Sequence, residues 1–234
     1  MSLPPPLALA PAPRLAIEKI GTEGNAVAVI DGALTTPDDA IGLAASRNFT
    51  PIGPYYPGVR ASLGGETAAA FAAGLSPVIG EALGLSATRW RGEAFFSIVT
   101  AAPDSLAPIQ RLPHFDGLEE SRVAALVFLA HADFGGTSFY RHRATGFEAI
   151  TAERYPLYGE ALKADVARHG LPPPDYIGDG APLFDEIANF PPAFNRLLLY
   201  RGNVLHCSRM RNTHALSADP RRGRLTINMF LQPA

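Results

Sequence analysis

The chain has 234 residues, of which 47% are hydrophobic and 18% charged, with a formal net charge of −2. These values are typical of a globular protein with a sizeable core, and they exclude the disordered and coiled-coil classes. The near balance of charge and the lack of a dense Lys/Arg cluster exclude nucleic acid as an expected partner. The single cysteine, Cys207, rules out an internal disulfide and is typical of a reducing compartment, so we expect a cytoplasmic protein. No stretch reaches the roughly 20 apolar residues that span a membrane, so no membrane association is expected.

The chain begins with a segment rich in proline and small apolar residues, and we expect residues 1–20 to form a flexible arm. This segment lacks the basic start of a signal peptide, and its prolines interrupt the apolar helix that a signal peptide needs. We expect residues 21–90 to form a mainly helical flanking region that begins with a short strand at 26–30.

Two helices are predicted within this flanking region. Thr36 followed by Pro37 looks like an N-cap with proline at the first helical position, and predicts a helix to about Ser46. Residues 66–83 are alanine-rich, with apolar residues at helical spacing, and Pro77 is expected to split or kink that helix.

From about residue 91 the sequence changes to short apolar runs that are typical of strands. The predicted strands are 95–100, 123–130, 137–141, 196–200 and 224–231. Helix-compatible sequence and a proline-rich loop interrupt them at about 151–190, which we interpret as an insertion. We therefore expect a single domain, 1–234, of the mainly β class with flanking helices. Residues 91–234 would form a double-stranded β-helix (a cupin-like jelly roll) packed against N-terminal helices.

His114 and Asp116 are the first candidate metal ligands. In an extended segment, residues i and i+2 point to the same side, so both side chains would face inward. His206, after a glycine turn that follows an apolar strand, is the best candidate for the third ligand. Two histidines and one carboxylate on one side of a metal, with the other side open, form the arrangement used for iron(II) and oxygen chemistry. An isolated His-x-Asp is common in surface turns, so the order of the surrounding elements carries most of the weight.

The remaining histidines lie in polar or turn-like sequence and are interpreted as solvated surface residues. They are His131, His142, His169 and His214. Cys207 would point away from His206 across an extended strand and is interpreted as a packing residue. Trp90, Tyr55 and Tyr56 are interpreted as packing residues, with a substrate entrance as the alternative.

The order of motifs resembles the prolyl-hydroxylase-like branch of the 2-oxoglutarate- and iron(II)-dependent oxygenases. The motifs are His114-Phe115-Asp116, the apolar strand ending Val127-Phe128-Leu129, the Gly135-Gly136-Thr137 turn, His206, and a last strand opening on Arg224. The resemblance covers about residues 95–232. The preceding part is similar, more weakly, to uncharacterised bacterial members.

The resemblance implies that His114, Asp116 and His206 hold Fe(II). It also implies that Arg224 pairs with the distal carboxylate of the cosubstrate 2-oxoglutarate. Such an enzyme, a dioxygenase that is usually a hydroxylase, would release succinate and CO2 while it oxidises a peptidyl or small-molecule substrate. A planar guanidinium suits the anchoring role because it offers two parallel donors to a carboxylate and keeps its charge when buried.

Other residues are expected to assist at the cosubstrate. Alternation along the last strand places Thr226 on the face of Arg224, where its hydroxyl would reach the same carboxylate. Arg222 is a rival anchor, although it lies before Gly223 and belongs to the expected turn. The family's strand tyrosine is replaced by Phe128, so Tyr140 on the next strand could substitute for it, with an ordinary core tyrosine as the alternative.

Two other functions remain open. A cupin-like metal enzyme that does not use 2-oxoglutarate would keep the triad and free Arg224 for a substrate carboxylate. A non-catalytic jelly-roll binding protein would have the three ligands by coincidence. The loops at 52–60 and 151–190 are expected to line the pocket and set specificity, and the sequence leaves the substrate and the oligomeric state open.

Overall fold

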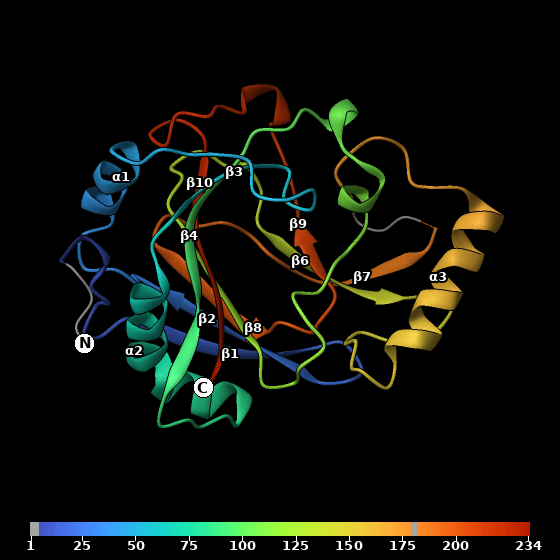
Figure 1. Cartoon of the computed structure of the whole chain (residues 1–234), viewed down its shortest axis with the longest axis horizontal. Coiled ribbons are helices and arrows are strands. Elements are labelled where there is room, and N and C mark those ends of the chain that lie inside the picture. The colour runs from blue at the N-terminus through green and yellow to red at the C-terminus, as the bar shows by residue number, and fades with distance from the viewer. Residues whose placement is uncertain (1–4, 179–181) are drawn as a thin grey trace.

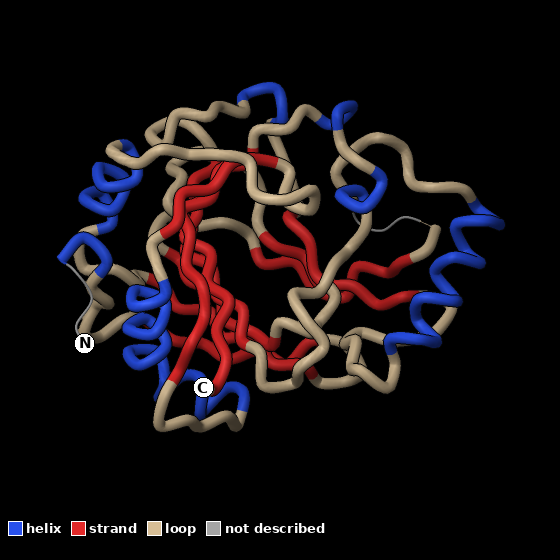
Figure 2. Tube along the Cα trace, in the orientation of Figure 1, coloured by secondary structure: helices blue, strands red, loops and turns tan. Residues whose placement is uncertain are grey.

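The computed structural model describes residues 5–178 and 182–234, in which two antiparallel sheets and three α-helices form the main elements (Figures 1 and 2). The larger sheet contains β1 (Arg14–Ile20), β2 (Asn25–Asp31), β3 (Gly58–Ser62), β4 (Trp90–Val99), β5 (Val123–Phe128), β8 (Arg196–Arg201) and β10 (Arg224–Pro233). The smaller sheet contains β6 (Thr137–His142), β7 (Phe184–Phe190) and β9 (His206–Ser208). The helices are α1 (Pro37–Ala45), α2 (Gly65–Leu83) and α3 (Tyr155–His169). Short 3-10 turns lie at Pro5–Leu7, Pro103–Ser105, Pro108–Arg111 and Thr213–Ala215.

The seven strands of the larger sheet lie in the order β1-β2-β8-β5-β10-β4-β3, and the smaller sheet has the order β7-β6-β9. Strands that are distant in the sequence are therefore neighbours, and β10 pairs with both β4 and β5. Figure 1 shows α1 and α2 beside the larger sheet and α3 at the opposite end of the molecule, next to the smaller sheet. None of the helices in the described residues is long and apolar enough to cross a membrane.

The larger sheet has an apolar core on one face and a cavity on the other. Leu225, Ile227 and Met229 of β10 belong to the main core cluster, which also contains the buried side chains of α1 and α2. Arg224 and Thr226 alternate with them and line a cavity on the other face of the strand. The alternation predicted for this strand is confirmed, because successive side chains of a strand point to opposite faces.

A second apolar cluster joins the two sheets. Phe139 of β6 packs edge-on against Phe190 of β7, with ring centroids 5.7 Å apart, and against Tyr200 of β8, with centroids 4.9 Å apart. Edge-to-face aromatic pairs of this kind stabilise beyond the area that they bury. These rings pack the smaller sheet against the larger one, and Tyr200 also lines the cavity.

The prediction for the N-terminal part is wrong in two respects. Residues Arg14–Ile20, expected in the flexible arm, form β1 and pair with β2 along their whole length. The helices are not N-terminal, because β1 and β2 precede them in the chain, and β2 and β3 belong to the larger sheet. Exposed and less exposed residues alternate along β1 as far as Glu18, as in a half-exposed edge strand, but Ala16 on the exposed face is apolar, so the sequence itself does not alternate cleanly.

Both predicted helices of this region are present, at Pro37–Ala45 and Gly65–Leu83. The second runs through Pro77 as one helix, so of the two outcomes expected for this proline the split is excluded, and the kink stays a prediction. Pro77 and Ala73, whose carbonyl loses its usual donor, are both exposed. Solvent can therefore satisfy the group that proline leaves without a partner.

The segment at 151–190 is only partly an excursion from the sheets. Its helix-compatible part forms α3, but Phe184–Phe190 forms β7 and pairs with β6. Residues 179–181 of this segment lie outside the described residues.

His142 contradicts the prediction that four histidines are solvated. It is fully buried, its Nε2 lies 3.2 Å from Asp165 Oδ2 of α3, and its Nδ1 lies 3.0 Å from the hydroxyl of Thr145. His131, His169 and His214 are exposed, as expected. The period of β6 places His142 on the face that α3 covers, and only the packing of that helix removes it from water.

Candidate metal centre

Backbone pairing brings the two candidate histidines together. The N–H of His114 donates to the carbonyl of His206, and the N–H of His206 donates to the carbonyl of His114, both at 2.9 Å. The N–H of Asp116 donates to the carbonyl of Gly202 at 2.7 Å. The His-x-Asp segment is therefore extended against β9 and the loop before it, and its two polar side chains point the same way.

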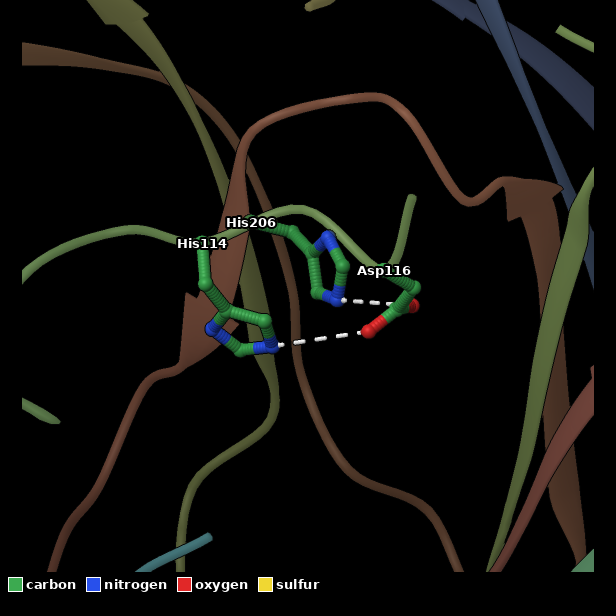
Figure 3. Close-up of side chains that lie close together, drawn as sticks. All are labelled: His114, Asp116 and His206. Carbon is green, nitrogen blue, oxygen red and sulfur yellow. Dashed lines mark ion pairs between the residues drawn. The ribbon is translucent and has the colours of Figure 1, made fainter. Parts of the chain in front are cut away.

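The three side chains converge on one point (Figure 3). His114 Nε2 lies 3.8 Å from Asp116 Oδ1, and His206 Nε2 lies 3.5 Å from Asp116 Oδ2. One ligand atom from each residue lies within 4.8 Å of the other two. Two imidazole nitrogens and one carboxylate oxygen on one side of a point suit a divalent metal ion.

The orientation of His206 is fixed by its second nitrogen. Nδ1 lies 2.8 Å from the carbonyl oxygen of Val204, so Nδ1 carries the proton and donates it. The lone pair of Nε2 is then directed toward Asp116. Metal-binding histidines commonly have such a carbonyl partner, which holds the ring and makes the ligand nitrogen more basic.

The electrostatics of the triad also suit a bound cation. Burial raises the pKa of Asp116 above its ordinary value, against the opposing effect of His206 and Arg60. His114 is open to the cavity, but the cavity wall keeps its imidazole from bulk water, and this lowers its pKa below the ordinary value, with His206 and Arg60 lowering it further. Asp116 Oδ2 is buried without a hydrogen-bond partner. A neutral imidazole and an unsatisfied carboxylate are what a cation would complete, so the residues present fit a metal.

The triad lies in the wall of a cavity of about 840 Å³. The side chain of His114 is 51% exposed, and the residue lines this cavity. The loop before β3 contributes Tyr55 and Tyr56, and α3 contributes Tyr158, so both segments that were predicted to line the pocket do so. Trp90, by contrast, packs in the main core.

Arg224 lies in the same cavity wall and is only 4% exposed. Its Nε and Nη2 donate to the carbonyl oxygens of Gly135 and Gly136, at 3.4 and 3.1 Å. Burial lowers the pKa of Arg224. Among the described residues no carboxylate forms an ion pair with it, and a buried charge without a counter-ion is costly. An anion that entered the cavity would supply the missing charge.

Thr226 lies beside Arg224 in the cavity wall, on the face that the sequence predicted. Its hydroxyl lies 2.6 Å from Asn228 Oδ1 and 3.4 Å from the carbonyl of Ser97. The hydroxyl of Ser97 and that of Tyr56 are both buried without a hydrogen-bond partner. The hydroxyl groups of Tyr56 and Thr226 thus lie in the same cavity wall as Arg224.

Two predicted cosubstrate residues do not line the cavity. Arg222 is exposed in the turn before β10. Tyr140 is fully buried on the far face of β6, where its hydroxyl donates to the carbonyl of Gly178 at 2.8 Å. Its position is of opposite parity to Thr137, which does line the cavity, so the strand directs Tyr140 toward α3. Tyr140 is therefore a core tyrosine, the alternative that the sequence had left open.

Cys207 is buried in the apolar cluster beneath α3, as its interpretation as a packing residue required. Burial raises the pKa of its thiol to about 12, so the thiolate that would bind a metal is disfavoured.

The sequence analysis gave Arg60 no role of its own and favoured packing for Tyr56, although both belong to the loop 52–60 that was expected to line the pocket. Both line the cavity, and the guanidinium of Arg60 lies 4.1 Å from the centre of the Tyr56 ring. The strand that carries Arg60 was not predicted, so the sequence did not indicate which way the Arg60 side chain points. An arginine that closely follows the aromatic pair of a proline-rich loop was the only available signal.

The fold and the site together define a mainly β protein with a His-His-Asp group that could hold a metal ion. The chain belongs to DUF6445, a family of unknown function whose model matches residues 11–231. No curated protein matches the chain.

Proposed function

We propose that this protein is an Fe(II)- and 2-oxoglutarate-dependent oxygenase of the hydroxylase type, built on a jelly-roll core. His114, Asp116 and His206 would hold the iron, and Arg224 would hold the distal carboxylate of 2-oxoglutarate. The iron would supply the activation of oxygen that oxidises a C–H bond of the substrate, with 2-oxoglutarate consumed to succinate and CO2. The substrate would be a small molecule or a peptide side chain that enters through the cavity.

One observation carries this proposal: the triad and a buried arginine without a carboxylate partner share one cavity. A metal site alone would be compatible with many functions. A guanidinium in the same wall adds a place for an anionic cosubstrate, and its planar fork matches a carboxylate. Neither feature alone favours 2-oxoglutarate over other anions, but their combination does.

The protein's own residues would perform three tasks. The carbonyl of Val204 keeps the His206 lone pair directed at the metal. The carbonyls of Gly135 and Gly136 hold the guanidinium of Arg224 in one orientation, so a carboxylate meets donors that are already placed. The aromatic wall, which includes Tyr158 and Tyr176, keeps the site largely apolar and limits the access of water.

The test is an anaerobic titration of the purified protein with Fe(II) and then 2-oxoglutarate. A weak visible charge-transfer band that requires both additions is expected, and it should be lost in Arg224→Gln but retained in Arg222→Gln. On admission of air, succinate should accumulate. Absence of the band together with absence of 2-oxoglutarate consumption would overturn the proposal.

The alternative is a metal enzyme that does not use 2-oxoglutarate. It is favoured by Phe128, which stands where the resembled family has a tyrosine, and by Tyr140, which faces away from the cavity. In that enzyme Arg224 would bind a substrate carboxylate directly. Oxygen uptake that is equal with and without 2-oxoglutarate would support this alternative.

A further inference from the structure

Arg60 occupies the same face of the larger sheet as Arg224. In β3 it is opposite Ser97 of β4, and Ser97 is opposite Thr226 of β10. Residues opposite one another in adjacent antiparallel strands point to the same face, so Arg60 and Thr226 lie in one row two strands apart, roughly 10 Å. Arg60 therefore projects into the cavity at a separate position from Arg224, in agreement with its place in the cavity lining.

Aromatic rings hold the Arg60 side chain in place. Its guanidinium carbon lies 4.1 Å from the centre of Tyr56, 5.4 Å from Phe95 and 5.5 Å from Phe230. Cation–π contacts use the faces of the rings and leave the N–H groups of the guanidinium without acceptors. Nε is buried and has no hydrogen-bond partner, and among the described residues no carboxylate pairs with this arginine.

The charges in the cavity wall are mainly positive. Apart from the histidines, the described charged residues that line it are Arg60, Asp116, Lys163 and Arg224. Asp116 is committed to the metal, and Arg224 to the cosubstrate, in the function proposed above. Arg60 is left as a half-buried cation without an assigned partner, and it lines the same cavity as the triad. An anionic group bound to Arg60 would therefore share the cavity with the reacting centre.

The mouth of the cavity is apolar. Tyr55, Ile109 and Tyr155 line it and are 73%, 46% and 49% exposed, which is unusual for large apolar side chains. An exposed apolar rim around a concave site marks a surface that binds an apolar group. The ligand would thus combine an apolar body at the mouth with an anionic group at Arg60.

We propose that the substrate is an apolar or aromatic carboxylic acid whose carboxylate binds Arg60 while its body contacts the aromatic rim. That this acid is turned over as a substrate rests on the proposed function. Its binding at Arg60 does not, and can be measured without turnover. One guanidinium carries one positive charge, which matches a carboxylate more closely than a phosphate dianion. The residue would then determine specificity, whereas Arg224 would serve the cosubstrate.

The experiment compares two matched probes, 3-phenylpropanoate and 3-phenylpropanamide, which differ only in the ionised group. Their affinities for the full-length protein are measured by ligand-observed NMR. The protein is used metal-free and again with Mn(II) and saturating 2-oxoglutarate, so that failure of metal or cosubstrate binding leaves the first measurement intact. The variants are Arg60→Gln, Arg60→Lys and the exposed control Arg222→Gln, with folding checked by circular dichroism.

Wild type and Arg222→Gln should bind the carboxylate at least about tenfold more tightly than the amide. Arg60→Gln should lose this preference and keep its affinity for the amide. Arg60→Lys should show an intermediate preference, because lysine keeps the charge but lacks the planar pair of donors. This variant replaces Arg60→Gln in the comparison if Arg60→Gln does not fold. A wild-type protein that binds neither probe, or binds both equally, overturns the proposal. So does a preference that survives in Arg60→Gln, or a carboxylate probe that displaces 2-oxoglutarate.

Discussion

The guanidinium of Arg224 donates a hydrogen bond to the carbonyl oxygen of Gly136, with Nη2 and the oxygen 3.1 Å apart. The turn that carries this carbonyl is packed too closely for a larger residue. A Cβ on Gly136 would lie 1.8 Å from the carbonyl oxygen of Phe190. On Gly135, where φ is +86°, it would lie 1.6 Å from the carbonyl oxygen of Arg209. The position of the arginine therefore depends on two consecutive glycines in the turn that leads into β6 of the smaller sheet.

Replacing Gly136 by alanine should disturb both the fold and the anchor. We expect Gly136→Ala to lower the free energy of unfolding by about 1–3 kcal/mol, because the new methyl group displaces the backbone of β7. The affinity for 2-oxoglutarate should fall as the carbonyl moves away from Arg224. Denaturant unfolding and a binding titration measure the two effects.

Gly42→Ala in α1 is the matched control, since a Cβ there meets no atom within 4 Å. It should stabilise the protein by about 0.4–1 kcal/mol, because alanine restricts the unfolded chain. Equal unfolding free energies for Gly136→Ala and wild type would show that the turn tolerates a side chain.

Removing a metal ligand should reduce metal binding far more than removing a surface histidine. Loss of a partner of a metal ligand typically lowers affinity 10–100-fold, so loss of a ligand itself should cost at least about 100-fold. We expect this for His114→Ala and His206→Ala, with metal content measured after equilibration with Fe(II) or Zn(II). The control is His131→Ala, an exposed histidine that stacks on Phe194 and should keep the wild-type content. Unchanged metal content in both ligand variants would instead favour a non-catalytic binding protein.

Two tyrosine variants separate a residue of the cavity wall from a core residue. The hydroxyl of Tyr56 is buried beside that of Ser97 and near Arg224, it makes no hydrogen bond of ordinary geometry, and it can turn to donate to a carboxylate. A hydrogen bond to a charged group contributes about 1.5–3 kcal/mol, so Tyr56→Phe should raise the KM for 2-oxoglutarate roughly tenfold or more.

Tyr140→Phe should leave that KM unchanged, since its hydroxyl donates to Gly178 outside the cavity. It should lower the free energy of unfolding by about 1 kcal/mol through the lost hydrogen bond. A raised KM for 2-oxoglutarate in Tyr140→Phe, with an unchanged KM in Tyr56→Phe, would instead place Tyr140 at the cosubstrate.

Asp31 should make the free energy of unfolding depend on pH in the acid range. It lies in one row with Arg14 of β1 and Arg196 of β8, and Arg196 donates to both of its oxygens at 2.6 and 3.0 Å. The hydrogen bonds from Arg196 lower the pKa of Asp31 to about 2, against burial, with Arg14 adding to the effect. In the unfolded chain the same carboxyl has a pKa near 3.8.

Since the folded pKa is the lower one, the stabilisation is complete above about pH 4. It is lost as the pH falls toward 2, because the unfolded state takes up its proton first. The shift corresponds to about 2 kcal/mol, so Asp31→Asn should be less stable than wild type by about that amount at pH 7. The difference should shrink between pH 4 and 2. Denaturant unfolding at several pH values measures it, and the exposed variant Glu160→Gln should stay within about 0.5 kcal/mol of wild type throughout. A difference that is constant with pH would contradict the assignment.

Much of the candidate site followed from local pattern. The alternation of β10 predicted that Arg224 and Thr226 share a face, and the two-residue spacing of His114 and Asp116 predicted that their side chains point the same way. Both expectations need only the period of an extended chain. The apolar runs of β5, β8 and β10 were recognisable for a second local reason: a strand that is buried on both faces has few polar residues.

The errors occurred where orientation depended on a partner. Tyr140 and His142 lie on the face of β6 that α3 covers, and nothing in the local sequence shows which face a distant helix will cover. Arg60 lies in a strand whose identity depends on pairing with β4, and β1 is a strand because β2 is beside it.

By itself, the sequence of this protein determined the mainly β class, the residues able to bind a metal, and the side of the last strand that carries Arg224. These properties depend on residue type and on a period of two, which are local. The tertiary structure decided that His114 and His206 pair through their backbones, that Arg222 remains in solvent, and that Arg60 joins the cavity. Those outcomes depend on strand register and helix packing between distant segments, and they are set by the burial of the whole core rather than by any short stretch of chain.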